Sequence, residues 1–156
     1  MIIKITGAKK SDTKDILLLI NELADYEHLN PPDPDARKRL IKDAFGKKPL
    51  YYLLLAKTDG KTIGYAIYFY TYSSFLAKRT LYLEDIYISS EFRKLGTGKL
   101  LFDELVKIAR KKSCGRMEWC VLNWNSNAIR FYDKLGAKAL KEWIYYRLSL
   151  RKREDS

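Results

Sequence analysis

The residues whose spacing most directly predicts chemistry are Arg93, Gly96 and Gly98, which stand between a predicted strand and a predicted helix. Glycines let the backbone pass close to a ligand, and a helix start presents free N–H groups at its positive end. Together these features predict a binding site for an anion such as a phosphate. The pattern is not a P-loop, and Leu101 stands where a dinucleotide-binding loop has its third glycine. Taken alone, the two glycines are equally typical of an ordinary strand-to-helix turn.

A second motif runs from Asn125 to Gly136 and includes Tyr132. On its own it is typical of a short amphipathic helix, with Asn125 or Ser126 as the N-cap and Gly136 at the end. The motif therefore carries no functional signal until it is considered together with the glycine loop.

Carboxylates supply the third candidate chemistry, because they attract cations and can act as bases. Glu84 lies in an otherwise apolar predicted strand, where the alternative reading is a buried ion pair. Asp85 follows directly, so the two side chains point to opposite faces of a regular strand, unless a bulge brings them to one side. Glu22 and Asp25 lie on a predicted helix, and we expect both on its solvated face.

These residues require a scaffold of helices and strands. Three consecutive predicted strands flanked by helices argue against a regular doubly wound fold and favour an α+β fold with a mixed sheet. Since no repeat or linker divides the chain, we expect one domain over residues 1–150 and a basic tail over 151–156. In chain order, the patterns predict a strand at 1–6, helices from about 11 and over 35–45, strands at 50–56, 63–72 and 81–89, a helix from 97 to about 112, a strand at 116–122, a helix over 125–135, and one or two strands within 139–148.

Composition narrows the class of protein further. The 156 residues carry 30 Lys and Arg against 19 Asp and Glu, and a net charge of +11 attracts nucleic acid, anionic membranes or phosphate-bearing cofactors. Cys114, Cys120 and the single His28 are too few for a structural zinc site or a disulfide framework, and we expect no metal. The longest apolar run, 50–56, is too short to span a bilayer and no signal peptide is evident, so we expect a cytoplasmic protein without a membrane partner.

The two motifs, in this order and at this separation, resemble those of the GNAT N-acetyltransferase superfamily. The resemblance implies a three-layer α/β/α fold with a mixed, mostly antiparallel sheet of about 6–7 strands. Within the superfamily, nearly the whole chain is similar to the diamine acetyltransferases, the spermidine/spermine N1-acetyltransferase family. The matching segments are residues 22–27 (ELADYE), Phe45-Gly46 with Pro49, residues 69–72 (FYTY), residues 82–85 (YLED), Phe92 to Gly98, and Trp124-Asn125 through Tyr132.

The resemblance implies that acetyl-CoA is the acetyl donor. The glycine loop would hold its pyrophosphate, the strand end at 86–88 would pair with its pantetheine arm, and the helix start at 125–128 would hold the far side of that arm. Backbone N–H groups near Ile86 would stabilise the oxyanion of the thioester carbonyl. The expected cofactor-binding residues are Ile86, Tyr87, Ile88, Arg93, Lys94, Leu95, Gly96, Thr97, Gly98, Lys99, Asn125, Ser126, Asn127, Ala128 and Tyr132.

It also implies direct transfer to an amine without an acyl-enzyme, which agrees with the lack of a nucleophile motif. Glu84 would be the general base, with a pKa raised by burial, and Tyr132 the general acid that protonates the leaving thiolate. The residues expected to contact the amine substrate are Tyr26, Glu27, Glu84, Asp85, Glu118, Trp119 and Cys120.

The substrate is less sharply predicted than the reaction. A small di- or polyamine is the first hypothesis, and a protein lysine, a protein N-terminus or a thialysine-type amine is the second. A nucleic-acid-binding module that uses the basic surface is the third, although no usual binding motif is present. The family resemblance also suggests a homodimer, with residues 144–148 as a candidate part of its interface.

Overall fold

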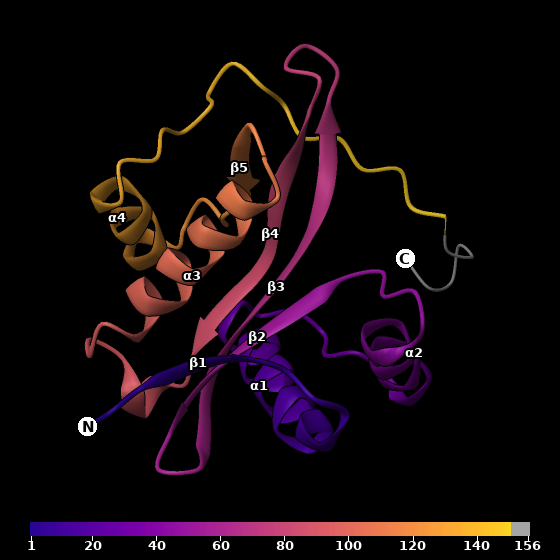
Figure 1. Cartoon of the computed structure of the whole chain (residues 1–156), viewed down its shortest axis with the longest axis vertical. Helices are drawn as coiled ribbons and strands as arrows, with labels where there is room; N and C mark the ends of the chain where they lie inside the picture. The colour runs from indigo at the N-terminus through magenta and orange to yellow at the C-terminus, as the bar shows by residue number, and fades with distance from the viewer. Residues whose placement is uncertain (151–156) are drawn as a thin grey trace. The chain divides into compact units, whose positions relative to one another are not determined.

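The computed structural model describes residues 1–150, which fall into two compact units, Met1–Cys120 and a second that begins at Val121. Every helix and strand predicted in the first unit is present, with ends that differ by a few residues. The single domain expected over residues 1–150 stays a prediction. The elements of the first unit are β1 (Lys4–Gly7), α1 (Thr13–Tyr26), α2 (Pro34–Phe45), β2 (Tyr52–Thr58), β3 (Lys61–Ser73), β4 (Lys78–Ile88), α3 (Thr97–Lys111) and β5 (Arg116–Trp119) (Figure 1).

The strands of the first unit form one five-stranded sheet in the order β1-β2-β3-β4-β5. Neighbouring strands are antiparallel except β4 and β5, which are parallel because α3 makes the crossover between them. The mixed, mostly antiparallel sheet is confirmed, whereas the expected count of about 6–7 strands is wrong for the described residues.

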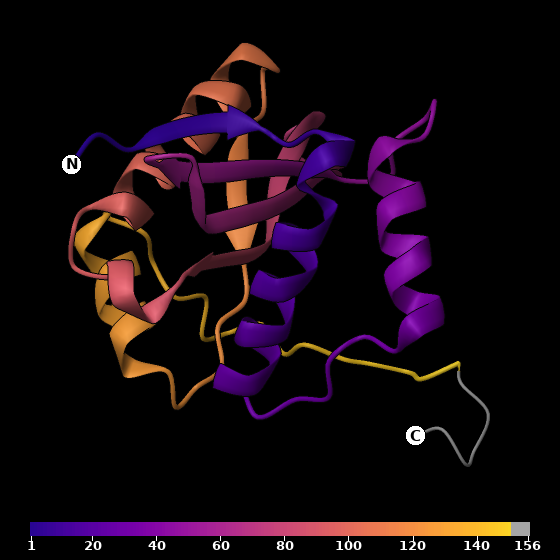
Figure 2. The same cartoon turned by 90° about the horizontal axis from the view of Figure 1, so that it is seen from below.

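Helices cover both faces of this sheet, α1 and α2 on one face and α3 on the other (Figure 2). Ile16 and Leu19 of α1 belong to the same buried cluster as Tyr65 and Ile67 of β3. The fully buried Leu105 lies on α3, which contacts β4 and β2. The three-layer α/β/α arrangement is therefore present within the first unit.

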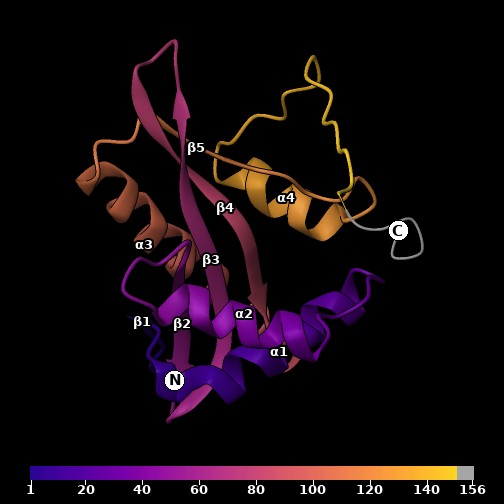
Figure 3. The ribbon, with the colours of Figure 1, turned by 90° about the vertical axis from the view of Figure 1, so that its right-hand side faces the viewer.

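Strands β3 and β4 form a long hairpin that extends past β2 (Figure 3). Pairing of β2 with β3 reaches only Tyr68, whereas the β3–β4 ladder continues to Ser73 and Lys78. At the other end of β3, Asp59 and Gly60 have φ values of 48° and 74° and make the predicted tight turn after β2.

A β-bulge interrupts the pairing of β3 with β4. Ile67 pairs with Asp85 and Tyr68 pairs with Leu83, so Glu84 is the additional residue on β4. The parallel ladder with β5 also ends at Leu83. The bulge thus marks the place where β4 and β5 separate.

Up to residue 150, the second unit contains one helix, α4 (Ser126–Lys134), followed by a segment without strands. The Asn125 side chain caps α4 by accepting a hydrogen bond from the Ala128 N–H, and Gly136 follows the helix with a φ of 87°, as predicted. The one or two strands predicted within 139–148 are wrong for the described residues. Every residue from 138 to 150 is exposed. Side chains that favour strands form one only where another strand pairs with them, and no described strand pairs with this segment.

The basic tail expected over 151–156 lies outside the described residues. Within residues 1–150, no helix combines the length and the apolar composition that crossing a membrane requires.

Candidate active site

The edge of β4 beyond the bulge is open to an extended ligand. On the β5 side, no strand of the described chain lies beside Ile86, Tyr87 or Ile88. On the other side Gly64 pairs with Ile88, and a Cβ at Gly64 would lie 2.8 Å from the Tyr87 carbonyl oxygen, so only glycine allows this close approach. Free main-chain groups on a strand edge can pair with an extended ligand as they would with another strand, which is the contact expected of a pantetheine arm.

Between β4 and α3 the chain makes the tight turn predicted from its glycines. Gly96, with a φ of 82°, precedes the first residue of α3, and Lys94 also has a positive φ of 63°. No side chain caps this end of α3, so the amides of Thr97, Gly98 and Lys99 have no partner within the helix. The space that a Cβ at Gly96 would occupy is open. The turn therefore offers a set of N–H donors suited to a phosphate oxygen.

The start of α3 carries a polar atom without a partner. The hydroxyl oxygen of Thr97 is buried and finds no hydrogen bond among the described residues, although buried hydroxyls are normally paired. The ammonium of Lys99 lies 2.8 Å from the Asp103 carboxylate, so its charge is already paired. An oxygen-rich ligand is a suitable partner for this helix start, and the residues present fit the phosphates of acetyl-CoA.

Arg93, in the loop between β4 and α3, contacts both α1 and β4. Its guanidinium lies 4.9 Å from the ring centroid of Tyr26 and 5.4 Å from that of Tyr87, and its Nε donates a hydrogen bond to the Ile88 carbonyl. Arg93 is predicted to contact the cofactor and Tyr26 the amine. The two side chains contact each other, so the β4–α3 loop meets the end of α1.

Glu22 ties α1 to the same loop. Its carboxylate accepts hydrogen bonds from the hydroxyls of Tyr87, at 3.2 Å, and Ser89, at 3.0 Å. The expectation of a solvated Glu22 is wrong, because the helix turns this residue toward β4, whereas Asp25 is exposed as predicted. Burial, followed by the neighbouring Glu22, raises the pKa of Tyr87, so its hydroxyl stays protonated and can donate.

A carboxylate pocket of about 400 Å³ opens on the α1/α2 face of the sheet. In a regular strand Asp85 would point to the α3 face, but the bulge turns it to the same face as its partner Ile67. The alternative in which a bulge brings both acids to one side is thereby confirmed. The lining residues are Leu40, Leu50, Tyr51, Ile67, Phe69, Glu84 and Asp85.

Burial distinguishes the two acids. Glu84 is exposed, so the expectation that burial would tune this residue is wrong. Burial, followed by the charges of Glu84 and Glu27, instead raises the pKa of Asp85 to about 6, against the opposing effect of a hydrogen bond from the Tyr65 hydroxyl at 3.3 Å. Asp85 is therefore the desolvated carboxyl of the pocket, and a cation that enters would stabilise its ionised form.

Glu27 and Tyr51, near Asp85, also contribute to the polarity of the pocket. Burial raises the pKa of Glu27, which lies at the end of α1. Burial also raises the pKa of Tyr51 to about 12, and its hydroxyl donates to the Leu40 carbonyl. The tyrosine hydroxyl here is thus a donor, and the carboxyls supply the negative charge.

The residues predicted on β5 are not brought into the carboxylate pocket. The Trp119 ring packs edge-on against Phe102 of α3, with centroids 5.3 Å apart, on the opposite face of the sheet. Glu118 pairs with Tyr82 in the β4–β5 ladder, and the Tyr82 hydroxyl donates to the Cys120 sulfur at 3.4 Å. Their predicted contact with an amine stays a prediction.

The second unit holds the remaining predicted residues. Asn125, Ser126, Asn127 and Ala128 form the capped start of α4, whose first amides have no partner within the helix. Tyr132 lies on α4 with its ring next to that of Phe131, at a centroid distance of 5.5 Å. Their roles toward acetyl-CoA stay predictions.

Sequence reasoning did not select the apolar walls of the carboxylate pocket. Ile67 and Phe69 lie on the same face of β3 as Tyr65, because every second residue of a strand points to the same face. Knowing which face one of these three residues occupies would therefore have identified the other two. Leu40 and Leu50 carry no such signal, because α2 and the loop after it approach the sheet only in the tertiary structure. Within residues 1–150, no three histidine, cysteine or carboxylate side chains gather in a way that could hold a metal ion.

Comparison with known proteins agrees with this geometry. Residues 17–137 match the model of the acetyltransferase (GNAT) family. Thialysine N-epsilon-acetyltransferase of Bos taurus is 36% identical over 148 residues, which cover 90% of this chain and 86% of that protein. Spermidine/spermine N(1)-acetyltransferase-like protein 1 of Homo sapiens is 35% identical over 156 residues, which cover 94% of this chain and 22% of that protein.

A solved structure described as a probable acetyltransferase shares the fold. Its TM-score is 0.82 at 22% identity, with 96% of this chain and 99% of that chain covered. The family match spans more than half of the sequence, and the similarity to the thialysine enzyme, over 90% of this chain, supports it. The chain therefore belongs to the GNAT family and is an N-acetyltransferase that acts on amines with acetyl-CoA as donor.

Proposed function

We propose that the protein transfers the acetyl group of acetyl-CoA to a primary amine of a small di- or polyamine. The observation that carries this proposal is the carboxylate pocket, because two acids line apolar walls next to the open edge of β4. An alkyl chain with a cationic group at each end matches such a pocket in polarity, since its methylenes suit the apolar walls and its ammonium groups suit the acids.

The donor would be held mainly by main-chain groups. The amides of the β4–α3 loop and the first turn of α3 would bind its pyrophosphate, and the edge at Ile86 to Ile88 would pair with its pantetheine arm. Arg93 within this loop and Glu22 on α1 fix the position of the loop, so we assign them a positioning role. Asn125 to Ala128 would hold the far side of the arm.

The two acids would divide the work at the amine. Asp85, desolvated and near Glu27, would anchor the distal ammonium group, and Glu84 at the exposed bulge would take the proton from the reacting one. Neutralising an alkylammonium at pH 7 costs about 4.6 kcal/mol, so a base at this position is valuable.

The transfer itself needs no acyl-enzyme. Glu84 accepts a proton from the ammonium, directly or through water, and the nitrogen lone pair forms a bond to the acetyl carbonyl carbon. N–H groups near Ile86 would stabilise the oxyanion. The carbon–sulfur bond breaks, the sulfur keeps the electron pair, and the Tyr132 hydroxyl protonates it. The nitrogen gives up its second proton as the amide forms, and this proton returns to the Tyr132 oxygen, directly or through water. The products are an N-acetylamine and free CoA.

Thiol release from acetyl-CoA tests this function directly. Spermidine, spermine, putrescine, thialysine, lysine and a lysine peptide would be compared with the wild-type protein and with Asp35→Asn, which removes an exposed acid of α2 outside the pocket. We expect the highest kcat/KM for a di- or polyamine with both proteins. Turnover of the peptide alone would contradict the substrate class while leaving the reaction intact.

Thialysine-type and protein amines form the second candidate class. The similarity to thialysine N-epsilon-acetyltransferase favours the former, since that substrate also carries a primary amine on a short chain. A higher kcat/KM for thialysine than for putrescine would decide in favour of this alternative.

A homodimer is the proposed assembly. The end of the second unit exposes large apolar side chains, which in a monomer would remain in contact with water. A second copy is the partner that would cover them, with residues 144–148 in the interface. The exposed residues are Leu140, Trp143, Ile144, Tyr145, Tyr146, Leu148 and Leu150. Light scattering should give twice the chain mass, and a monomer at micromolar concentration would contradict the proposal.

A further inference from the structure

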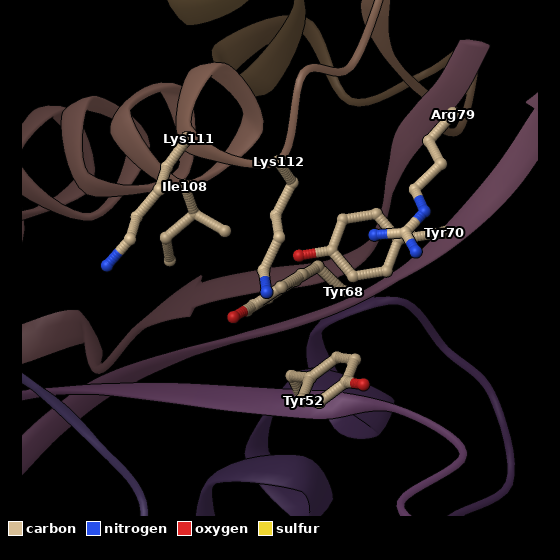
Figure 4. A pocket seen from close by; sticks show the side chains of 7 residues that line it. All are labelled: Tyr52, Tyr68, Tyr70, Arg79, Ile108, Lys111 and Lys112. Atoms are coloured by element: carbon tan, nitrogen blue, oxygen red, sulfur yellow. The ribbon is translucent and has the colours of Figure 1, made fainter.

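A second cavity lies on the α3 face of the sheet, at the C-terminal end of α3 (Figure 4). Its volume is about 540 Å³. Because neighbouring residues on a strand point to opposite faces, Tyr52 and Tyr68 face this cavity, whereas Tyr51 and Ile67 face the carboxylate pocket. The residues that line this tyrosine–cation pocket are Tyr52, Tyr68, Tyr70, Arg79, Ile108, Lys111 and Lys112.

Three tyrosine rings form the wall of the pocket on the sheet side. The rings of Tyr52 and Tyr68 are stacked with centroids 5.4 Å apart, and Tyr70 meets Tyr68 edge-on at 6.1 Å. Tyr52 is 40% exposed and presents its ring to an entering molecule. Burial raises the pKa of Tyr68 to about 12, so its hydroxyl is a hydrogen-bond donor at any physiological pH.

Three cations form the other walls. The Arg79 guanidinium lies over Tyr70 at 5.4 Å, and the ammonium of Lys112 reaches toward the hydroxyl of Tyr68 (Figure 4). Within the described chain, no ion pair neutralises Arg79, Lys111 or Lys112, and no carboxylate lines the pocket. The cavity is therefore positively charged.

The helix dipole alone explains only some of the cations in the tyrosine–cation pocket. Lysines at the end of a helix interact favourably with its negative end, and this suffices for Lys111 and Lys112. It does not account for Arg79, which comes from β4, nor for the three tyrosines. The glycine loop lies at the other end of α3, about 20 Å away along a helix of this length, so the cavity is separate from the proposed donor site.

We propose that the tyrosine–cation pocket binds a small phosphorylated aromatic compound, of which a mononucleotide is the type. Its ring would stack on the tyrosines, and its phosphate would be held by Arg79 and Lys112 through charge-assisted hydrogen bonds. The volume is in the range that accommodates one ring system with a phosphate group. The charge of the pocket excludes the amine substrate, and this proposal does not depend on which amine that is.

Calorimetric titration with AMP tests the proposal, using the full-length protein saturated with CoA so that the donor site is occupied. We expect one AMP bound per chain. Lys112→Gln and Arg79→Gln should each weaken binding by about tenfold, as expected for loss of a charged hydrogen bond. Tyr52→Ala should weaken it by a similar factor. Arg110→Gln is the matched control, since Arg110 is exposed on the same turn of α3 and does not line the pocket.

Several outcomes would overturn the proposal. These are no AMP binding at millimolar concentration, binding that CoA abolishes, and affinity equal in the wild-type protein and in all three pocket variants. Inorganic phosphate or adenosine bound as tightly as AMP would also overturn it, because either ligand lacks one half of the proposed recognition. Thermal unfolding of each variant verifies that a lost affinity does not reflect a lost fold.

Discussion

The carboxylate pocket and the tyrosine–cation pocket lie on opposite faces of the same strands and carry opposite charge. Tyr51, Ile67 and Phe69 line the first, and their chain neighbours Tyr52, Tyr68 and Tyr70 line the second. The alternation of a β-strand therefore lets one stretch of sequence build two sites. The bulge at Glu84 is the exception, since it adds Asp85 to the acidic side.

The same comparison shows that net charge does not describe a site. The chain carries +11 overall, which would repel a polyamine at long range, yet the carboxylate pocket has two acids and no lysine or arginine in its lining. The tyrosine–cation pocket has the opposite composition. Placement of a few side chains thus outweighs the average charge over short distances.

The largest expected effect separates the proposed general acid, Tyr132, from the tyrosine–cation pocket, which turnover should not need. Tyr132→Phe should lower kcat by about 10²–10⁴ while the fold is kept, because a phenylalanine cannot protonate the thiolate. Tyr72→Phe, at an exposed position that lines neither pocket, and Lys112→Gln should both stay within twofold of wild type. Saturating both substrates in the thiol-release assay gives kcat directly, and wild-type turnover of Tyr132→Phe would remove this residue from the chemistry.

The next effect concerns the proposed base. Glu84→Gln should lower kcat by about 10²–10³, because the amide cannot accept the ammonium proton. Asp35→Asn removes an exposed acid outside the pocket and should leave kcat unchanged. Partial recovery of the Glu84→Gln rate at pH 9–10, where more amine is neutral, is expected from the same mechanism. An unchanged kcat at pH 7 would move the base elsewhere.

Asp85 should act on binding rather than on the chemical step. Asp85→Asn should raise KM for putrescine by about 10–100-fold and leave KM for butylamine within threefold, because only the diamine has a second ammonium to anchor. In the wild type, kcat/KM for putrescine should fall as the pH falls through the pKa of Asp85, about 6. An equal change for both amines would show that Asp85 does not recognise the second charge.

The same substitution should stabilise the fold. The pKa of Asp85 is raised from 3.8 to about 6, so the folded state holds its proton more tightly, and the cost of the buried charge grows as the pH rises through this window. Asp85→Asn should therefore raise the free energy of unfolding by about 3 kcal/mol at pH 7.5 and by almost nothing at about pH 3. Urea unfolding at the two pH values measures both, and a variant that is less stable than wild type at pH 7.5 would contradict the assigned cost.

Salt should produce the smallest difference between the pockets. The cations of the tyrosine–cation pocket are exposed, so raising NaCl from 50 to 300 mM should weaken AMP binding by about threefold. KM for putrescine should change less, because Asp85 is less exposed than these cations. Calorimetry and steady-state kinetics in the two buffers give the comparison, and equal sensitivity would mean that both pockets are equally open to ions.

Much of the scaffold could be predicted because it depends on local patterns. The Asp59–Gly60 turn, the Asn125 cap and the helix after Gly96 follow from residue types that favour those conformations within a few positions. The prediction of strands within 139–148 was wrong for the complementary reason. The residues of this segment have the composition of a strand, but a strand forms only when another strand pairs with it, and the sequence of the segment does not specify that partner.

The active site shows the same division at the level of single residues. The motifs and the acids could be identified from the sequence. The sequence also predicted, wrongly, that Glu84 is buried and that Glu22 lies on a solvated helix face. The β3–β4 register decided the first, since the bulge exposes Glu84 and leaves Asp85 only partly exposed. The packing of α1 against β4 decided the second, since Tyr87 and Ser89 bind Glu22.

The amino-acid sequence by itself determined the reaction class of this protein through its resemblance to the GNAT superfamily, and that resemblance rests on local features, a glycine turn at a helix start and a capped helix with its tyrosine. Only the tertiary structure decided which acid is the less exposed, which tyrosines belong to which pocket, and where the edge of β4 is left open. Those properties depend on register, on strand separation and on the faces that helices cover, and these are set by contacts between residues far apart in the chain.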